Sequence, residues 1–203
     1  MGMVIDTLFR GNMRRLGSYM EGYGDLTLPL KAPEYSKKKA MEHFARAGYR
    51  EMGEDGVLKN ERGERLVVEL TFADSSTLMT NVCSILRQEA LKCGVDLRLD
   101  PLTYNVCSRK VFEKRYQAAL WAWPLQTPFP RLYETFASEL AYDARGNPVG
   151  NTNNIFAVAD TELDAALDAE RNAPDGAALK KALHRAQKRI HELCVWIPGW
   201  REP

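Results

Sequence analysis

Residues 66–72 read LVVELTF, a run of β-branched and apolar side chains that predicts a buried strand. A helix is expected to follow, because apolar residues recur at i, i+4, i+7 and i+8 from Leu78 onward. Ser75, Ser76 or Thr77 would cap its first turn, since hydroxyl side chains accept hydrogen bonds from free helical N–H groups. The stretch therefore begins as a strand followed by a helix.

The same order repeats after Gly94, the predicted end of that helix. Residues 95–99 alternate as a second strand, residues 103–114 fit a second helix, and residues 117–123, QAALWAW, predict a third strand. A β-α-β-α-β order with short links favours a parallel sheet with right-handed crossovers. We therefore expect a single α/β domain whose mixed sheet has this parallel core and is flanked by helices, with the three strands ending at one edge.

Candidate ligand-binding residues lie where these strands end, because open α/β sheets bind ligands at the carboxyl ends of their strands. The third strand continues into PLQTPFP at 124–130, a rigid loop rich in proline, and residues 139–159 form a long polar loop. The candidates are Ser75, Tyr104, Trp123, Gln126, Thr127, Asn153 and Asn154.

Each candidate also has a structural interpretation. Trp123 is as suited to packing at the sheet edge as to stacking on a ligand, and a serine before a helix is first of all a cap. Asn153 and Asn154 make turn hydrogen bonds readily, which we favour slightly over ligand binding. Trp121 shares a face with Trp123 but lies deeper in the strand, so we expect it in the core.

The flanking segments predict further helices and turns. Residues 1–34 are expected to form an irregular connection, after which Ser36 caps a helix that ends at Gly48. Turns are expected at Asp55-Gly56 and Arg62-Gly63, as in a hairpin. Near the end of the chain, Asp160 or Thr161 opens a helix that runs to about Arg171, and a longer amphipathic helix follows, for which packing on the sheet is the simplest account.

Composition excludes several classes of partner. The chain has 203 residues, and its 28 basic and 27 acidic residues give a formal net charge of +1, so we expect no nucleic-acid partner. No apolar run is long enough for a membrane span, and the first residues lack the pattern of a signal peptide. A hydrophobic content of 45% is typical of a globular protein with a real core.

Chemistry at a catalytic or metal site is not indicated. GxSxG, HExxH and glycine-rich phosphate loops are missing from the sequence, so we expect neither an enzyme nor a cofactor. The four cysteines are spread without a CxxC pair, and Cys83 and Cys93 lie too far apart on one helix to form a disulfide. His184, His191 and Cys194 share a helix face, but solvated histidines beside a packed cysteine are a simpler account than zinc.

Several short motifs, taken in order, resemble the second lobe of the family 5 extracellular solute-binding proteins, the peptide- and nickel-binding components of ABC importers. The helix ending in Ala-Gly-Tyr, the Asp-Gly-Val-Leu turn, the Gly-Val-Asp strand, the strand ending in Trp, the Asn pair, the helix opened by a Leu-Asp pair and the closing Ile-Pro all have counterparts. They stand at 35–49, 55–58, 94–97, 116–123, 153–154, 161–164 and 197–198. The surroundings are most similar to the subgroup of microcin-C and oligopeptide binders.

The resemblance implies that the chain is one excised lobe of a larger protein. Residues 1–34 would be the hinge-proximal connecting segment and residues 35–203 the α/β ligand-binding lobe. The implied partners are a peptide or similar small polar solute, a missing N-terminal lobe, and the membrane permease of an importer. The implied location is periplasmic or extracellular, with the whole protein either free or lipid-anchored.

One position departs from the family pattern. Peptide-binding members commonly have an Asp three residues after the strand-ending Trp, where it pairs with the α-ammonium of the peptide; this chain has Gln126. An amide cannot supply a full counter-charge. The ligand then either lacks a free amino terminus at that point or meets another acid. A stand-alone α/β protein-interaction domain, and a small enzyme, are the alternative functions.

Overall fold

The structure is a computed structural model that describes residues 2–122 and 131–201. The chain divides into two compact units. The sheet unit consists of residues 34–110 and 116–122, and the helical unit contains the described residues of 2–33, 111–115 and 131–201. The assignment of residues 35–203 to one ligand-binding lobe stays a prediction. Within the described chain, the helical unit has a core of its own.

The sheet unit contains the predicted parallel sheet. Strands β4 (Val67–Ala73), β5 (Asp96–Leu102) and β6 (Ala118–Leu120) pair in the order β5-β4-β6, and both pairings are parallel. Helix α3 (Thr77–Lys92) links β4 to β5, and α4 (Tyr104–Phe112) links β5 to β6. The β-α-β-α-β prediction is therefore confirmed. The antiparallel strands of the described chain form two separate two-stranded sheets and do not join this one.

Alternation along β4 directs its side chains to two different environments. Leu70 and Phe72 are buried against Cys83 of α3. Partly buried apolar side chains from α3, β5 and β6 surround them: Met79, Leu86, Leu97, Leu99, Ala118 and Leu120. This face is the apolar one, as expected for a sheet covered by an amphipathic helix.

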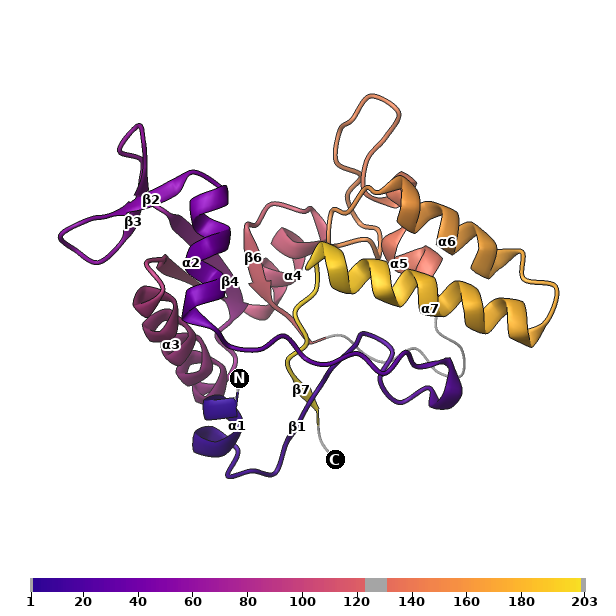
Figure 1. Ribbon diagram of the computed structural model, residues 1–203, viewed down its shortest axis with the longest axis horizontal. Helices are drawn as coiled ribbons and strands as arrows, with labels where there is room; N and C mark the ends of the chain where they lie inside the picture. Colours follow the sequence, from indigo (N-terminus) through magenta and orange to yellow (C-terminus); the bar gives the residue numbers. More distant parts are fainter. Residues whose placement is uncertain (1, 123–130, 202–203) are drawn as a thin grey trace. The chain divides into compact units, whose positions relative to one another are not determined.

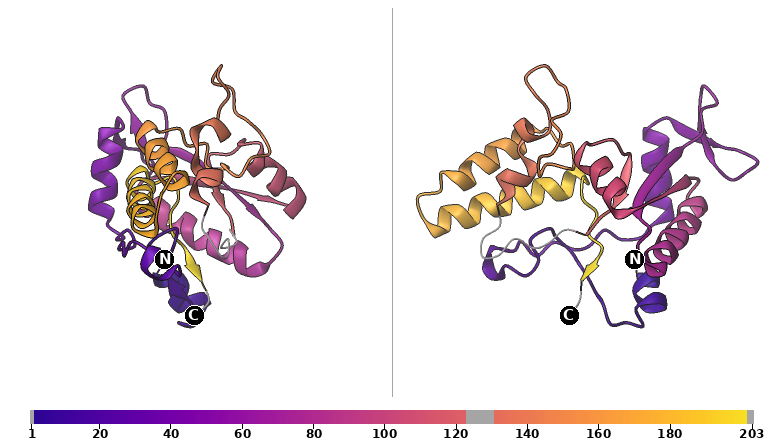
Figure 2. Two further views of the ribbon diagram at one scale, coloured as in Figure 1. Left: turned by 90° about the vertical axis from the view of Figure 1, so that its right-hand side faces the viewer. Right: turned by 180° about the vertical axis from the view of Figure 1, so that it is seen from behind.

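The opposite face of β4 is polar and is covered by α4. Lys110 of α4 donates hydrogen bonds from Nζ to Glu69 Oε1 at 2.6 Å and to Asp100 Oδ2 at 2.7 Å. Thr71, which is fully buried, donates to the same Asp100 oxygen at 2.9 Å. Burial acts to raise the pKa of Asp100, but these hydrogen bonds hold it below its ordinary value. The two helices thus lie on opposite faces of the sheet (Figures 1 and 2).

A helix and a hairpin precede the sheet, as predicted. Helix α2 (Lys37–Arg46) starts at the N-cap Ser36, whose side chain accepts a hydrogen bond from the Lys39 N–H. Strands β2 (Tyr49–Met52) and β3 (Leu58–Asn60) pair antiparallel across the Asp-Gly turn.

Gly94 is required where the hairpin meets the end of α3. Its φ is +83°, and a Cβ at this position would lie 2.6 Å from Leu58 Cγ. The Leu58 N–H donates to the Gly94 carbonyl at 2.8 Å, so the backbones approach closely. Only glycine combines this conformation with this contact.

The helical unit is built on two long helices that lie side by side (Figures 1 and 2). They are α6 (Thr161–Arg171), capped by Asp160, and α7 (Gly176–Leu193), capped by Asp175. Arg189 of α7 binds Asp160 through both carboxylate oxygens, at 3.0 and 2.7 Å. The shorter elements are α1 (Gly2–Leu8), β1 (Arg14–Arg15), η1 (Gly24–Leu26), α5 (Leu132–Phe136), η2 (Ser138–Leu140) and β7 (Trp200–Arg201).

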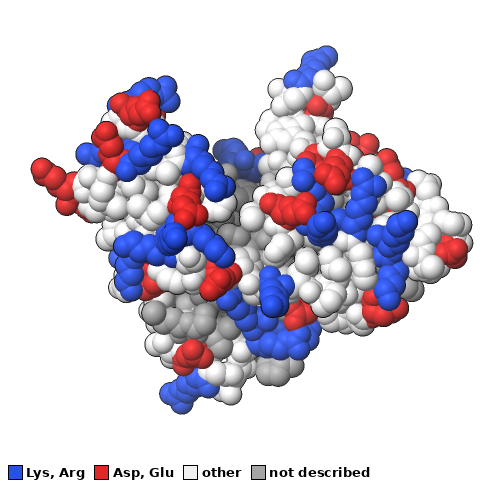
Figure 3. Space-filling view, viewed as in Figure 1, with Lys and Arg blue, Asp and Glu red and all other residues white. Residues whose placement is uncertain are grey.

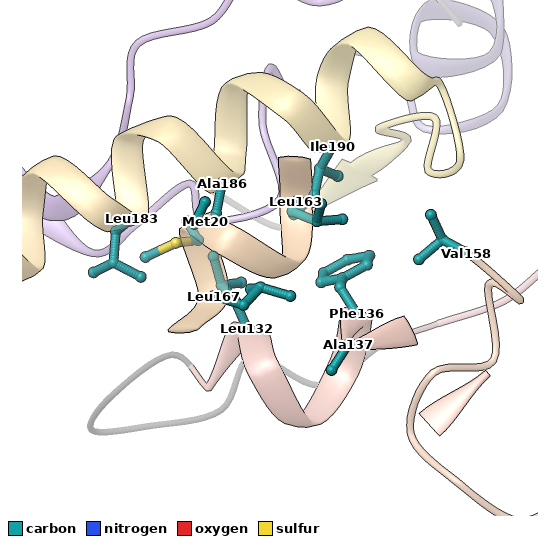
Figure 4. Close-up of a cluster of buried hydrophobic side chains, with 11 residues drawn as sticks. Met20, Leu132, Phe136, Ala137, Val158, Leu163, Leu167, Leu183, Ala186 and Ile190 are labelled. Atoms are coloured by element: carbon teal, nitrogen blue, oxygen red, sulfur yellow. The ribbon is translucent and has the colours of Figure 1, made fainter. Parts of the chain in front are cut away.

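The core of this unit lies between α5, α6 and α7 (Figure 4). Eleven buried residues form it: Met20, Leu132, Phe136, Ala137, Val158, Leu163, Ala166, Leu167, Leu183, Ala186 and Ile190. The prediction that the last helix packs on the sheet was therefore wrong. Helix α6 offers an apolar stripe of its own, so the apolar face of α7 is buried against a helix.

Residues 2–33 belong to the helical unit, and hydrogen bonds connect them to α7. The buried Gln187 accepts a hydrogen bond from the Leu28 N–H at 2.8 Å and donates to the Leu26 carbonyl at 2.8 Å. In the middle of this segment, β1 pairs antiparallel with β7. The connecting segment also begins with a helix, α1, which we had not predicted.

Charges of both signs are interspersed on the face drawn in Figure 3. This distribution is in keeping with the near-balanced composition. None of the helices in the described ranges combines the length and apolar character that a membrane span requires.

Candidate functional site

The carboxyl edge of the β5-β4-β6 sheet is the candidate site. The chain leaves β4 toward α3 on one face and leaves β5 toward α4 on the other. Where adjacent parallel strands diverge in this way, a crevice opens outside their carboxyl ends. The Asp74 N–H donates to the Leu102 carbonyl at 3.0 Å, which ties the ends of β4 and β5 together.

Ser75 lies at this edge, directly after β4. The N-cap of α3 is Ser76, whose hydroxyl accepts a hydrogen bond from the Met79 N–H at 3.2 Å. Ser75 is exposed, and the capping role proposed for it belongs to its neighbour. Its hydroxyl therefore does not start the helix, and its role as a ligand contact stays a prediction.

Tyr104, the first residue of α4, is 60% exposed at the same edge. Its ring stacks on Trp121, with 6.0 Å between ring centroids and 15° between ring planes. The contact joins the segments that follow β5 and β6, the two outer strands of the sheet. Stacked rings at a strand edge form a flat apolar surface on which an aromatic or aliphatic ligand group can lie.

Trp121 was expected in the core, but it is only half-buried. Strand β6 ends at Leu120, so Trp121 lies beyond the last paired residue and is not covered by a neighbouring strand. The Trp-Ala-Trp sequence could have marked Trp121 as a candidate site residue, because alternate residues of a strand share a face and Trp123 was already a candidate. We assigned too much of that segment to the strand.

Three predicted ligand-binding residues, Trp123, Gln126 and Thr127, lie outside the described residues. They follow β6 in the sequence and stay predictions. The edge described above is therefore defined by Ser75, Tyr104 and Trp121.

The two predicted asparagines belong to a loop of the helical unit and differ in exposure. Asn153 is exposed, whereas Asn154 is fully buried. The Asn154 amide donates to the carbonyls of Ala137 at 2.9 Å and Val158 at 3.1 Å, and its oxygen accepts from the Val158 N–H at 3.3 Å. Asn154 thus holds the loop in place, and Asn153 is the residue whose side chain is presented outward.

Lys114 fixes the start of the same loop. Its Nζ donates to the Thr152 hydroxyl at 3.0 Å and to the Val149 carbonyl, and burial lowers its pKa. The Asn151 N–H adds a hydrogen bond to the Phe112 carbonyl at 3.0 Å. A loop held at several points can present a side chain with little loss of conformational entropy.

Metal and thiol chemistry find no support among the described residues. In that part of the chain, no three or more His, Cys, Asp or Glu side chains are grouped so as to hold a metal ion. All four cysteines are free thiols. Burial raises the pKa of Cys83 to about 11, which keeps this thiol protonated and unreactive at neutral pH.

Comparisons with known proteins found no matching family model and no matching curated sequence. Solved structures do match. The oligopeptide-binding protein AppA of Bacillus subtilis, solved with a nonapeptide, superposes with a TM-score of 0.83 at 17% identity. The alignment covers 98% of this chain and 38% of AppA. This chain has the fold of one lobe of a periplasmic binding protein.

Two further structures share this lobe fold. NikZ of Campylobacter jejuni, solved with Ni(L-His), has a TM-score of 0.80 at 19% identity over 99% of this chain and 39% of its own. DppA of Helicobacter pylori, a periplasmic binding protein associated with an ABC transporter and solved with the peptide STSA, has a TM-score of 0.76 at 16% identity. It is covered over 35% of its length by 97% of this chain. This chain thus spans less than two fifths of each of these three proteins.

Proposed function

We propose that this chain is the second lobe of the substrate-binding component of an ABC importer, where it captures a peptide or a similar small polar solute. The observation that carries the proposal is the exposed Tyr104–Trp121 stack at the carboxyl edge of the sheet. The lobe fold supports it, since the matching structures include proteins solved with a nonapeptide and with the peptide STSA.

The proposed ligand contacts in the sheet unit combine a polar and an apolar part. Ser75 offers a hydroxyl that can accept or donate a hydrogen bond, and Tyr104 offers a ring face. The residues after β6, Trp123, Gln126 and Thr127, are proposed to extend this surface. Gln126 in place of an acid favours a ligand without an ammonium group at that point.

In the helical unit, the exposed Asn153 is a separate candidate contact. Asn154 keeps a supporting role, because its amide already binds two backbone carbonyls and one N–H. A substitution of Asn154 would therefore act on the loop as a whole, whereas one of Asn153 would act on a single side chain.

The partners follow from the share of the matching proteins that this chain covers. At 38% of AppA, the chain would need a first lobe to enclose a ligand, and an importer would supply a membrane permease that receives it. DppA is a periplasmic protein, and so is an oligopeptide-binding protein of Thermotoga maritima whose structure also matches. We infer a periplasmic or extracellular location for the whole protein, which would be either free or lipid-anchored.

An isolated lobe should bind its ligand weakly. Polar contacts on an open surface contribute only ~0.5–1.5 kcal/mol each. Immobilising the ligand costs at least ~4 kcal/mol. Enclosure by a second lobe excludes water and roughly doubles the contacts, so tight binding should need both lobes.

Calorimetry with a peptide library on the 203-residue chain and on the complete two-lobed protein tests the proposal. We expect tight binding to the two-lobed protein and weak or no binding to the lobe alone. Submicromolar binding by the lobe alone would contradict the half-site account. Turnover of a substrate would support an enzyme, and failure of both forms to bind any solute would support a protein-interaction domain.

A further inference from the structure

The helical unit contains a pocket of about 440 Å³ whose lining residues all belong to this unit. One wall consists of Leu26 from η1 and of Leu179 and Leu183 from α7, which we call the leucine wall. Leu183 also belongs to the buried core, where it lies beside Met20 (Figure 4). The pocket thus has an apolar side that is continuous with the core.

The other wall is polar and comes from the start of α5 and the end of α6. It consists of Arg131, Tyr133, Glu134, Glu170 and Arg171. Since η1 and α7 contribute only leucines, all the charged groups that line the pocket in the described chain lie on this wall. An apolar wall facing a few polar groups is the usual composition of a small-molecule site.

Both carboxyl groups of the polar wall already have partners in the protein. Glu134 Oε1 accepts a hydrogen bond from Arg131 Nη1 at 2.8 Å, so these two charges form a pair. The carboxyl of Glu170 lies at the start of α5, where the backbone N–H groups of Leu132 and Tyr133 act on it, the first at 3.3 Å from Oε1. Glu170 therefore serves the free N–H groups of a helix start and is not a ligand group.

The charge of the polar wall is positive in mild acid. Burial raises the pKa of Glu170 to about 7, and the charge of Glu134 acts in the same direction. At pH 6 the Glu170 carboxyl is thus mostly neutral, and the Glu134 charge is offset by Arg131. The charge that is left on the wall is that of Arg171.

Arg171 has no acidic partner among the residues that the structure describes. Its guanidinium carbon lies 4.1 Å from the centre of the Tyr133 ring, a cation–π contact that positions the side chain. The Tyr133 hydroxyl donates to Glu139 Oε1 at 2.7 Å, which holds the ring in turn. Arg171 is exposed, and within the described chain its N–H groups meet neither a carboxylate nor another acceptor. These donors are therefore accessible to a ligand.

We propose that this pocket binds a small monocarboxylate with an apolar body, whose carboxylate pairs with Arg171 and whose body lies on the leucine wall. A planar guanidinium can form two parallel hydrogen bonds with a carboxylate, which orients the ligand as well as adding affinity. A cation would meet an unpaired positive charge, and a neutral ligand would leave that charge without a counter-charge. This site is independent of the proposed solute site at the sheet edge.

The test compares 3-phenylpropionate, which is an anion at pH 6, with 3-phenylpropanamide, a neutral analogue of nearly the same shape. Both are titrated at pH 6 into the 15N-labelled 203-residue chain, with amide chemical shifts as the measure of binding. We expect saturable shifts for the acid that centre on residues lining the pocket. The amide should bind at least ~5-fold more weakly, because hydrogen bonds between two charged groups are the stronger ones.

Variants separate the guanidinium from other causes. Arg171→Gln removes the charge but keeps a polar side chain, so the acid should bind at least ~5-fold more weakly and no better than the amide. Arg185→Gln is the matched control, because Arg185 is an exposed arginine of α7 that does not line the pocket. It should bind the acid like the parent. Leu179→Ala shortens the leucine wall and should weaken the acid and the amide alike, by ~3-fold or more.

Four results would overturn the proposal: no saturable shifts, equal binding of acid and amide, unchanged affinity for the acid in Arg171→Gln, or unchanged affinity for both ligands in Leu179→Ala. If a variant does not fold, the comparison of acid and amide on the parent chain decides.

A variant at the sheet edge distinguishes the two proposed sites. Tyr104→Ala should leave binding of the acid unchanged, because Tyr104 belongs to the sheet unit. A loss of acid binding in this variant would place the acid at the sheet edge and would also overturn the proposal. The failure of this site and that of the solute site are therefore distinguishable.

Discussion

In the helical unit, eleven buried residues form one apolar core between helices. In the sheet unit, by contrast, one face of β4 is apolar, and on the other face Lys110 forms hydrogen bonds with two carboxylates. The helical unit thus resembles a small bundle that is stabilised mainly by burial. The sheet unit has paired charges on one face of its central strand, whereas the charge pair of the helical unit, Arg189–Asp160, lies at a helix start. The sheet unit also leaves an aromatic stack exposed at its edge. The difference indicates which unit carries stability and which offers a surface for binding.

The largest expected effect on the free energy of unfolding comes from substitutions in the apolar cores of the two units. Phe136→Ala and Phe72→Ala remove the same fully buried side chain from the helical and the sheet unit, and each should cost ~3–5 kcal/mol of the free energy of unfolding. Phe136 should fall at the upper end, because it also loses ring contacts with Tyr19 and Phe156. Urea denaturation of both variants gives the comparison. A smaller loss for Phe136→Ala would contradict the view that the helical core dominates.

The second effect concerns Glu170 of α6, a largely buried carboxyl in the helical unit. Burial raises the pKa of Glu170 from 4.5 to about 7, so the folded chain binds this proton more tightly than the unfolded chain. Stability from this group is therefore full below about pH 4.5 and falls as the pH rises to about 7. Glu170→Gln cannot ionise and should be more stable than the parent by ~1–3 kcal/mol at pH 8.

At pH 4 the same variant should match the parent, because both side chains are then neutral. Urea denaturation at the two pH values measures the difference, with Glu162→Gln as the exposed control on α6. An equal gain at both pH values would show that the effect comes from packing and not from ionisation.

The third effect tests the charged face of the sheet. Lys110→Met removes the donor shared by Glu69 and Asp100 and should cost ~1–2 kcal/mol at pH 7, between the values of exposed and buried pairs. The lowered pKa of Asp100 means that its contribution is present above pH 3.8 and is lost as the pH falls through the lower folded value. The cost should therefore shrink in acid.

Thermal unfolding at pH 7 and pH 3 measures this change. Lys188→Met is the control, since Lys188 is 69% exposed and lies 3.8 Å from its partner Glu192. If both lysine variants lose the same stability, the network on the sheet contributes no more than a surface pair.

The smallest effect on stability is expected at the sheet edge. Tyr104→Ala should change the free energy of unfolding by less than ~1 kcal/mol, because the ring is largely exposed and only its stack on Trp121 is lost. In the two-lobed protein that we propose, Tyr104→Ala should weaken solute binding measurably by calorimetry. Tyr35→Ala, at 59% exposure in the same unit, is the control. If both variants bind the solute equally well, Tyr104 is not a ligand contact and has only a structural role.

Local patterns were sufficient for the elements of this fold. Helix starts at Ser36, Ser76 and Asp160, and the three parallel strands, depend on neighbours within a few residues in the sequence, so propensity and periodicity could find them. The edge where the strands end followed from their common direction. The roles of Ser75 and Ser76 could not be separated, because either hydroxyl can cap a helix from the sequence alone.

The sequence by itself therefore determined the β-α-β-α-β core, its parallel direction and the place of the candidate site at its edge. Only the tertiary structure decided that α7 packs on α6 and that Trp121 stacks on Tyr104. It also decided that Glu170 is largely buried, with one carboxylate oxygen that has no hydrogen-bond partner among the described residues. Amphipathic faces and polar side chains can be read from a sequence, but it does not record which other face or group each one meets. That choice depends on contacts between residues far apart in the chain.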